Sequence, residues 1–423
     1  MHIFIHNFLR RLSTFPIGLI RIRNGTGSGK TGDIHKIHSP TAATSANINN
    51  YNSKGDDFMK FTCNTNELKK AIGTAARASS TKGLKTILEC ILFTTENDSI
   101  RLNSFDTITA IETTIYAHID EAGETAIPAK LLSEIISKFP DGETTIERTE
   151  KGRIRISGGS ASAYLTEMEA DQFPAFNHID GEVFKITEGE LKKLVSGTQF
   201  AAYQGEDKPV FTGLLFEIED GDLSVVAIDG FRMAKRRTNW NNAKPVKVII
   251  PVRTLREITR LLSNDDDQVK ITINESACVF EAENTMIYAR LIEGEFLNYN
   301  NIIPKTFKTR VRVETRLFEK SLEMSSVLAK EDGNYLIKMK VNAGSLEISA
   351  MSEYGSIDDE IPVYTEGEVL NIAFNVKYML DVLKVIEDDE IYMEFDSRLK
   401  PCIIRPVDSD KFMYMVVPVN VRN

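Results

Sequence analysis

The sequence contains few of the residues from which catalytic and metal sites are usually built. Its 423 residues include one tryptophan, four cysteines and six histidines, and four of the histidines fall within the first 58 positions. The cysteines lie far apart and form no CxxC pair; they are Cys63, Cys90, Cys278 and Cys402. This spacing argues against a zinc site or a disulfide framework and fits a reducing compartment, so we expect a cytoplasmic protein. No run of about 18 apolar residues occurs, which predicts no membrane-spanning segment.

The titratable residues that remain do not assemble into a catalytic set. His118 lies in an alternating strand pattern and His178 in a loop, where a structural role is the more common one. The acidic runs 265–267 and 387–390 stand between a helix pattern and a strand pattern and lack EF-hand spacing, which is typical of solvated turns. We therefore expect no catalytic residue, no metal and no cofactor, and a protein that is not an enzyme.

Residues 1–58 differ in composition from the rest of the chain. They hold seven of the 51 basic residues but only three of the 61 acidic ones, and their later part is rich in Ser, Thr, Asn and Gly. This composition predicts a disordered leader or a start assigned too far upstream, with Met59 as the true beginning. Segment 19–31 resembles a phosphate-binding P-loop that ends near Lys30, although Asn24 stands in place of its first glycine and no helix pattern follows. Nucleotide binding by this leader is kept as an alternative.

One sequence pattern occurs three times in the body of the chain. Residues 127–136, 250–258 and 374–383 each read as a short apolar strand that runs into an amphipathic helix. About 120 residues, roughly one domain length, separate successive copies. Each copy carries a base and, four residues later, an acid, and these pairs are Lys130 and Glu134, Arg253 and Glu257, and Lys377 and Asp381. Helix geometry places these charges on one face and the apolar residues on the other.

A second repeated pattern precedes each copy of the first. Residues 61–72, 184–195 and 311–322 each read as a strand, then a threonine, then a helix; the threonines are Thr65, Thr187 and Thr315. We expect each threonine to cap its helix, with Glu190 completing a capping box in the second copy. Alternating strand patterns fill the remainder. The chain is therefore predicted to be α+β, with three tandem repeats of two helices on antiparallel sheet, and with domains at 59–182, 183–308 and 309–423.

The repeated basic positions suggest contact with a polyanion in spite of the acidic balance of the whole chain. Lysine and arginine side chains that reach phosphates without reading bases give binding that is independent of sequence and sensitive to salt. On one helix, such a face is more often a solvated surface, but repetition at one position in three domains favours a shared role. A repeat scaffold that binds only proteins is the alternative.

Several motifs occur in the order found in one known family. They are residues 59–62, 171–174, 211–216, 227–234, 291–296 and 414–419. With these motifs, the chain from Met59 to its end resembles the beta subunit of bacterial DNA polymerase III, the replicative sliding clamp. The resemblance implies a clamp fold in a head-to-tail homodimeric ring that encircles double-stranded DNA and confers processivity without catalysis. It also implies binding to the clamp loader complex, the polymerase III alpha subunit and other clamp-motif proteins, and no membrane.

The resemblance also implies site residues. Positions that match family residues near DNA are Lys82, Lys130, Arg253 and Arg260, and repeat symmetry alone adds Lys69, Lys192, Lys193 and Lys377. The matching pocket for partner peptides is formed by Phe211, Ile228, Gly230, Phe231, Arg232, Met233, Leu297, Ile302, Met415, Val417, Pro418 and Val419. Matching dimer positions are Ala163, Val327 and Leu328. Leu297, Asn301, Val417 and Val419 depart from the usual family residues, so a different peptide preference is expected.

Overall fold

A computed structural model describes residues 58–80, 85–149, 152–174, 179–240, 244–331 and 333–421. Residues from Phe58 onward form one compact unit, which is described here by itself. The P-loop-like segment with Lys30, and also Lys82 and His178, lie outside the described residues.

The helices of this unit come in three pairs, as the two repeated patterns predicted. The pairs are α2 (Thr65–Ala75) with α3 (Ala129–Ile136), α4 (Glu188–Ser196) with α5 (Val252–Leu261), and α6 (Thr315–Ala329) with α7 (Val376–Leu383). Equivalent positions of α3, α5 and α7 carry Leu132, Leu255 and Met379, and all three side chains are fully buried. Burying an aliphatic side chain of this size contributes roughly 1.5–3 kcal/mol, so the repeated apolar face anchors each helix. Short 3-10 turns are η1 (Ala76–Ala78), η2 (Thr86–Glu89), η3 (Ala170–Gln172), η4 (Gln199–Ala201), η5 (Pro209–Thr212) and η6 (Tyr299–Asn301).

The predicted threonine caps are confirmed in one copy and wrong in two. Thr187 Oγ1 accepts a hydrogen bond from the backbone N–H of Glu190, as a capping threonine should, and the Thr187 hydroxyl donates to Glu190 Oε2 at 3.3 Å in place of the reciprocal backbone bond of a capping box. In the first copy, however, Asn64 caps α2 and Thr65 is the first helical residue. In the third copy Thr315 is again buried inside the helix, and Glu314 stands before it without a side-chain cap. A threonine hydroxyl can hydrogen-bond sideways instead, as Thr65 does with Thr144 at 2.8 Å.

The strands form four sheets, within which the pairs are antiparallel. The first is β5-β1-β7-β8-β9, with β1 (Lys60–Asn64), β5 (His118–Glu121), β7 (Glu143–Thr149), β8 (Arg153–Gly158) and β9 (Ala161–Thr166). The second is β10-β15-β16-β17-β4-β3-β2-β6, with β2 (Cys90–Glu96), β3 (Ser99–Phe105), β4 (Thr109–Tyr116), β6 (Glu124–Pro128), β10 (Glu182–Thr187), β15 (Gln268–Ile273), β16 (Ala277–Ala282) and β17 (Thr285–Arg290).

The other two sheets contain the strands of the third repeat. The third sheet is β14-β11-β12-β13-β26-β25-β24-β18-β22, with β11 (Gly213–Glu219), β12 (Asp222–Ile228), β13 (Arg232–Asn239), β14 (Val246–Pro251), β18 (Thr309–Glu314), β22 (Tyr364–Gly367), β24 (Glu390–Phe395), β25 (Cys402–Pro406) and β26 (Phe412–Val416). The fourth is β21-β20-β19-β23, with β19 (Leu336–Val341), β20 (Ser345–Ser352), β21 (Gly355–Pro362) and β23 (Leu370–Asn375).

Two of the sheets continue from one repeat into the next, which the sequence did not predict. Strand β17 of the second repeat pairs with β4 of the first, and β26 of the third pairs with β13 of the second. We call these two seams the first joint (β17 with β4) and the second joint (β26 with β13). The expected boundary after residue 182 falls at the start of β10, and that after residue 308 falls at β18.

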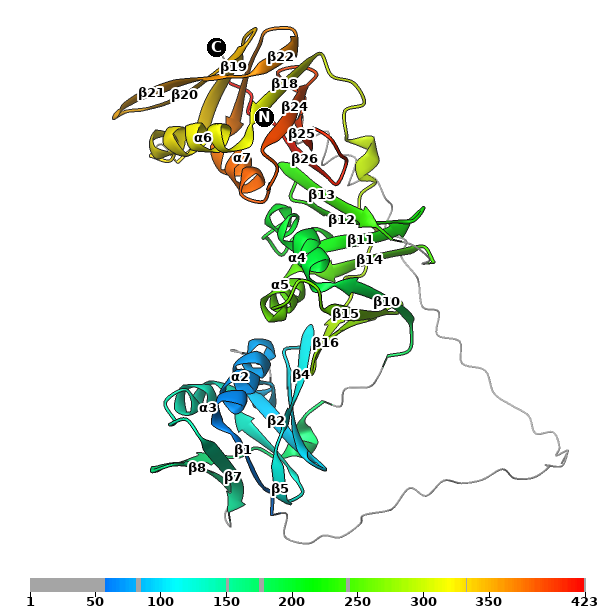
Figure 1. Cartoon of the computed structure of the whole chain (residues 1–423), viewed down its shortest axis with the longest axis vertical. Coiled ribbons are helices and arrows are strands. Elements are labelled where there is room, and N and C mark those ends of the chain that lie inside the picture. Colours follow the sequence, from blue (N-terminus) through cyan, green and yellow to red (C-terminus); the bar gives the residue numbers. More distant parts are fainter. Residues whose placement is uncertain are drawn as a thin grey trace, which may run out of the picture. The chain divides into compact units, whose positions relative to one another are not determined.

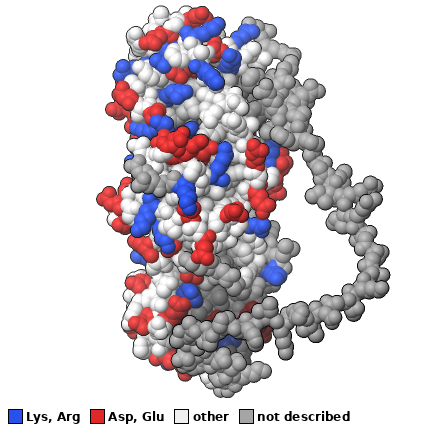
Figure 2. All heavy atoms as spheres, turned by 90° about the vertical axis from the view of Figure 1, so that its right-hand side faces the viewer, with Lys and Arg blue, Asp and Glu red and all other residues white. Residues whose placement is uncertain are grey.

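In Figure 1 the two helices of each pair lie close together, and strands β20 and β21 extend beside α6. Figure 2 shows one face of the molecule, on which basic and acidic side chains are interspersed over the described surface. No helix in the described ranges is long and apolar enough to cross a membrane. Within the same ranges, no group of three or more His, Cys, Asp or Glu residues is arranged to hold a metal ion.

Candidate functional site

Three of the predicted DNA-contacting residues are exposed on the helices and free of ion pairs within the described structure. Lys130 lies on α3, Lys193 on α4 and Lys377 on α7. Lys130 and Lys377 occupy equivalent positions of the repeat, whereas Lys193 lies on the first helix of its pair, so each helix pair offers at least one available cation. An exposed lysine of this kind can contact a phosphate at little cost, because its ammonium group need not give up another partner.

The other predicted DNA-contacting residues that the structure describes, which leaves out Lys82, are engaged within the chain. Salt bridges join Arg253 to Asp106 (2.7 Å), Arg260 to Glu257 (2.7 Å) and Lys192 to Asp265 (3.5 Å). The strongest departure is Lys69, whose side chain is only 25% exposed and donates to the Phe139 carbonyl oxygen at 2.8 Å. Lys69 therefore ties α2 to the segment after α3, and the helix surface is less basic than the sequence indicated.

Six of the predicted pocket residues meet in one apolar cluster near the second joint. They are Phe211, Ile228, Met233, Leu297, Ile302 and Met415. Ile228, Met233 and Met415 are at most 5% exposed, so they form the floor beneath the surface instead of its walls. Phe211 and the neighbouring Phe296 meet edge to face, with ring centroids 5.5 Å apart. Aliphatic, aromatic and methionine side chains together make a surface that adapts to several apolar ligands.

Arg232 ties the second repeat to the third at the edge of this cluster. Its Nε donates to Asp229 Oδ2 at 2.9 Å, its Nη1 to Asp381 Oδ2 at 2.6 Å, and its Nη2 to the Phe200 carbonyl oxygen at 2.6 Å. The guanidinium also lies over the rings of Phe200 and Tyr378, at 5.3 and 4.6 Å from their centroids. With a side chain only 10% exposed, Arg232 positions the pocket and offers little surface to a ligand.

The loop that precedes Arg232 presents an aromatic side chain. Gly230 has a φ of +95°, a conformation that favours glycine, and the Phe231 N–H donates to Asp229 Oδ1 at 2.8 Å. Phe231 is 38% exposed and stacks on Tyr378 with ring centroids 5.9 Å apart. Burial raises the pKa of Asp229 and of Tyr378 above their usual values, although the Phe231 amide and the Arg232 guanidinium oppose the shift of Asp229.

The last predicted pocket residues belong to the C-terminal segment that crosses the second joint. The Val417 N–H donates to the Phe231 carbonyl oxygen at 2.9 Å, and the Val419 N–H donates to the Ala373 carbonyl oxygen at 2.7 Å. Pro418 lies between these two anchors, and all three residues are half-buried. Val417 therefore lies against the pocket, whereas Val419 lines a separate groove of the third repeat.

Sequence reasoning missed Tyr378 and Asp381 as supports of this site. Asp381 is the third repeated acid, and its equivalent in the second repeat, Glu257, is also engaged, by Arg77 and Arg260. The recurrence of the acid was visible in the sequence. The partner of Asp381 was not visible in the sequence, because Arg232 belongs to the second repeat and Asp381 to the third.

The predicted dimer positions lie in the first and third repeats. Ala163 is on β9, the edge strand of the five-stranded sheet, where it packs partly against the core. Val327, on α6, is 52% exposed, and its neighbour Leu328 packs against the core. The residue after Ala163, Tyr164, is 57% exposed and was not singled out from the sequence.

Comparison with known proteins agrees with this architecture along the whole described unit. Family models of the DNA polymerase III beta subunit match residues 59–177 with its N-terminal domain, 185–298 with its central domain and 300–420 with its C-terminal domain. The beta sliding clamp of Bacillus subtilis is 30% identical over 375 residues, which covers 85% of this chain and 99% of that protein.

Solved structures give the same result. The DNA polymerase sliding clamp from Bacillus subtilis superposes with a TM-score of 0.84 at 30% identity, covering 86% of this chain and 100% of the other. The DNA polymerase III beta subunit from Thermotoga maritima gives 0.80 at 29% identity, with the same coverage. These matches define the class: the protein is a DNA sliding clamp, a processivity factor without catalytic activity. More particularly, the chain belongs to the bacterial DNA polymerase III beta subunit family, the beta sliding clamps.

Proposed function

We propose that two copies of this chain close head to tail into a ring around duplex DNA. The proposal rests on which sheets continue from one repeat into the next and which sheets end within a repeat. Within the described chain, two sheets span joints between repeats, whereas the five-stranded sheet of the first repeat and the four-stranded sheet of the third do not. Closed symmetric assemblies satisfy such complementary ends without leaving a sheet edge exposed.

Repeat equivalence specifies which edges would meet. At each joint, the last strand of a three-strand meander in one repeat pairs with the last strand of a three-strand meander in the preceding repeat. In the first joint these are β17 and β4, and in the second they are β26 and β13. The equivalent strands left at the edges are β9 in the first repeat and β21 in the third. We infer that β9 of one copy pairs with β21 of the other, twice per ring.

Charge and apolar surface at these edges are complementary. The strand beside β9 carries Arg153 and Arg155, whereas β21 carries the acidic run 358–360. Tyr164 on β9 and Val327 on α6 supply exposed apolar surface, and α6 packs against β21. Opposite charges favour pairing of unlike edges over like ones, because two copies of β21 would bring carboxylates together.

The helices would then face the DNA. Lys130, Lys193 and Lys377 are the first candidates for phosphate contacts, followed by Arg253 and Arg260 once their internal salt bridges exchange for phosphate. Contacts of this kind are independent of base sequence and permit sliding. Such a ring would hold DNA by encircling it, so a few weak contacts with phosphates suffice.

The apolar cluster at the second joint is proposed as the docking site for peptides of the polymerase alpha subunit, the clamp loader and other clamp-motif proteins. Phe211, Phe231, Leu297, Ile302 and Val417 would contact the peptide, over the buried floor described above. We propose that this protein meets these partners in the cytoplasm of a bacterium, where DNA is replicated.

The mass of the native particle and its retention on DNA test the ring together. We expect twice the chain mass by analytical ultracentrifugation, and retention on nicked circular DNA that is lost when the circle is linearised. Replacing Asp358, Asp359 and Glu360 with lysine should produce monomers, and adding Arg153→Glu and Arg155→Glu should restore dimers. A chain that stays monomeric, or that leaves circular and linear DNA equally, would instead be a protein-binding scaffold. Unchanged behaviour after removal of residues 1–58 would exclude a role for the P-loop-like leader.

A further inference from the structure

A cavity of the third repeat uses none of the residues proposed to contact DNA or a partner peptide. Its volume is about 290 Å³, and strands β18, β24 and β25, which are neighbours in the nine-stranded sheet, form one wall of it. Arg310 stands opposite Glu394 in this sheet, and Glu394 opposite Ile403, so the three side chains share one face. Segment 304–307, Asp396 and Arg405 complete the lining.

Two arginines of this cavity are held in place by one carboxylate. Arg310 donates from Nε and Nη2 to Glu394 Oε1, at 3.2 and 2.7 Å, and Arg405 donates from Nε to Glu394 Oε2 at 3.2 Å. Arg310 also lies over the rings of Phe307 and Tyr392, at 4.1 and 4.9 Å from their centroids. Both guanidinium groups are therefore oriented before a ligand arrives, which lowers the entropy that binding must overcome.

The two arginines keep donors that no group of the described protein uses. A guanidinium has N–H donors on all three of its nitrogens. Among the described residues, Nη1 of Arg310 and both Nη atoms of Arg405 make no hydrogen bond, and the two side chains are 30% and 37% exposed. Lys305 is also exposed in this lining, and no ion pair engages it in the part of the chain that the structure describes. The cavity thus offers two guanidinium groups and one ammonium group to a ligand.

The charges of the cavity do not cancel. Glu394 neutralises only one of the two arginines, and its side chain is 11% exposed with both oxygens engaged. Asp396, the other acid of the lining, pairs with Lys400 at 2.7 Å. Two positive charges remain, one shared by the arginines and one on Lys305. A compact group that carries two negative charges would balance them.

A phosphate monoester has this chemistry. It carries about 1.5 to 2 negative charges at neutral pH and three acceptor oxygens, whereas a carboxylate carries a single charge. The planar fork of a guanidinium matches the spacing of phosphate oxygens. The apolar part of the lining can meet the group that carries the phosphate, because the Phe307 side chain is 41% exposed.

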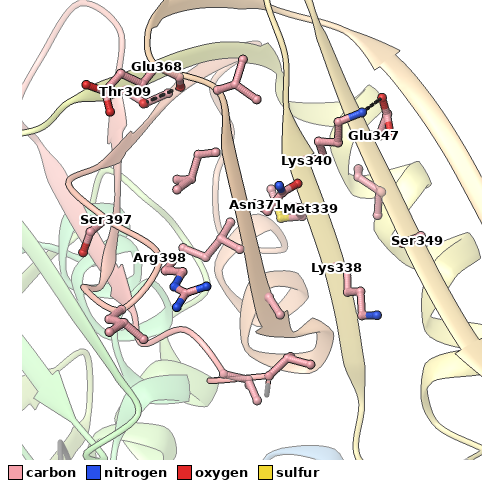
Figure 3. A pocket seen from close by; sticks show the side chains of 18 of the residues that line it. Thr309, Lys338, Met339, Lys340, Glu347, Ser349, Glu368, Asn371, Ser397 and Arg398 are labelled. Atoms are coloured by element: carbon pink, nitrogen blue, oxygen red, sulfur yellow. Dashed lines mark hydrogen bonds and ion pairs between the residues drawn. The ribbon is translucent and has the colours of Figure 1, made fainter. Parts of the chain in front are cut away.

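A larger groove of the same repeat provides a contrast. It has a volume of about 970 Å³ and is shown in Figure 3. Six acidic and four basic residues line it, and one of its lysines, Lys340, pairs with Glu347 at 2.8 Å. Lys338 is exposed in this groove, and no ion pair engages it among the described residues. Lys338 therefore resembles Lys305 in charge and exposure but lacks the arginine pair, which makes it a control position.

We propose that this cavity binds the phosphate group of a phosphate monoester. The free donors of Arg310 and Arg405 hold phosphate oxygens, and Lys305 supplies the remaining charge. The carrier, which is either a nucleotide or a phosphorylated side chain, lies against Phe307. This site depends neither on ring closure nor on peptide docking at the second joint.

Isothermal titration calorimetry of the full-length chain with methyl phosphate tests the proposal. We expect saturable binding, a loss of affinity of about tenfold for each of Arg405→Met and Lys305→Met, and no change for Lys338→Met. Arg405→Lys keeps the charge but not the fork, so it should lose less affinity than Arg405→Met. Lys30→Ala, in the P-loop-like segment, should bind like the unchanged chain. Urea unfolding checks that each variant is folded.

Three further ligands show which feature of the monoester is recognised. Dimethyl phosphate, a diester with one charge, should bind at least about tenfold more weakly than methyl phosphate. Adenosine monophosphate or the amide of acetyl-phosphoserine should bind more tightly than methyl phosphate, and whichever does so identifies the carrier as a nucleotide or a phosphorylated protein.

The proposal is overturned if methyl phosphate does not bind, or if folded Arg405→Met and Lys305→Met variants bind it like the unchanged chain. It is also overturned if Lys338→Met or Lys30→Ala weakens binding as much as Arg405→Met, since the phosphate would then lie elsewhere. Equal affinity for dimethyl phosphate would assign the cavity to diesters and would also contradict it.

Discussion

The two joints share one backbone geometry but are built from different side chains. At the first joint, small hydroxyls and helix-surface charges meet: Thr109 and Thr254 hydrogen-bond at 2.6 Å, and Arg253 pairs with Asp106. At the second joint, Arg232 lies among two carboxylates, a carbonyl and two aromatic rings, above an apolar cluster. The repeat therefore determines where domains meet, while side chains decide which meeting place can also bind a peptide.

A second arginine reinforces this difference. Arg236 donates to the Tyr414 hydroxyl at 2.9 Å and to the Val385 carbonyl oxygen at 2.6 Å, again across the second joint. Planar guanidinium groups bind carbonyls and stack on rings at once, which lysine cannot do. We infer that the second joint is the more rigid one, as a pocket made from two repeats requires.

The largest expected effect comes from breaking the second joint at Arg232. Arg232→Ala should lower the free energy of unfolding by about 3 kcal/mol, because it leaves Asp229 and Asp381 without their buried partner. It should also weaken binding of a clamp-motif peptide by at least tenfold while leaving the dimer intact. Urea unfolding followed by the fluorescence of Trp240, the single tryptophan, measures the first effect.

The matched change at the first joint is Arg253→Ala. That arginine side chain is 57% exposed, but its partner Asp106 is only 3% exposed. Because Asp106 keeps its hydrogen bonds from the Ile108 and Thr109 amides, we expect a loss of about 1–2 kcal/mol, with no effect on peptide binding. Equal losses at the two positions would contradict the difference proposed between the joints.

An effect of similar size is expected from the hydroxyl pair of the first joint. Thr254→Val should cost roughly 1–2 kcal/mol, because it leaves the buried Thr109 hydroxyl without a partner. The double replacement of Thr109 and Thr254 by valine should recover most of that loss, because no unpaired hydroxyl remains. Urea unfolding of Thr109→Val, Thr254→Val and the double variant measures the three losses of stability for a double-mutant cycle. A double variant as unstable as the sum of the single ones would show that the hydroxyls do not act as a pair.

The exposed lysines of the helices take part in neither joint, and we expect them to govern association with DNA. Replacing Lys130, Lys193 and Lys377 with alanine together should reduce the slope of log affinity against log salt by about 2 to 3. Titration of open, linear DNA at several salt concentrations measures the slope. Lys338→Ala, on the outer face of the four-stranded sheet, is the control and should leave the slope unchanged.

The smallest effect, on pH dependence, comes from the buried thiols. Burial, followed by the charge of a neighbouring glutamate, raises the pKa of Cys63 to about 12 and that of Cys90 to about 11. Since the folded pKa lies above the unfolded one, this contribution to stability is complete below about pH 8.5 and decreases as pH rises toward 11 and 12. Ellman's reagent should therefore label none of the four cysteines of the native protein at pH 8 within minutes.

The same thiols report which joint has loosened. Cys402 lies on β25, next to the second joint, and Cys90 on β2, away from it. Arg232→Ala should expose Cys402 to the reagent before Cys90, which peptide mapping of the labelled protein can follow. Simultaneous labelling of both would mean that the unit unfolds as a whole.

Local patterns in the chain predicted the secondary structure well. Helices after Pro128, Pro251 and Asn375 follow from a repeated strand-to-helix pattern, and Leu132, Leu255 and Met379 are buried where the pattern required. The cap positions were wrong by one residue in the first and third repeats, since Asn64 and Glu314 precede the threonines that the pattern favoured. Which of two adjacent polar residues caps a helix depends on the space available to each side chain, and Thr65 is buried against Thr144.

The site was only partly predictable. Phe211, Leu297 and Ile302 gather as the family resemblance implied, but whether a pocket residue is wall or floor depends on what covers it. Lys69 is charged and lies in an amphipathic helix, yet it bends to the Phe139 carbonyl, 70 residues away in the chain. No local pattern contains that information.

The sequence by itself determined the three repeats, their helices and the family. The tertiary structure alone decided that sheets run across the joints, that Arg232 is enclosed while Arg253 is exposed, and that β9, β21 and β23 are left as edges. The physical reason is that periodicity records which face of an element is buried, whereas partners across a joint come from segments more than a hundred residues apart. Their pairing energy exists only once both repeats have folded.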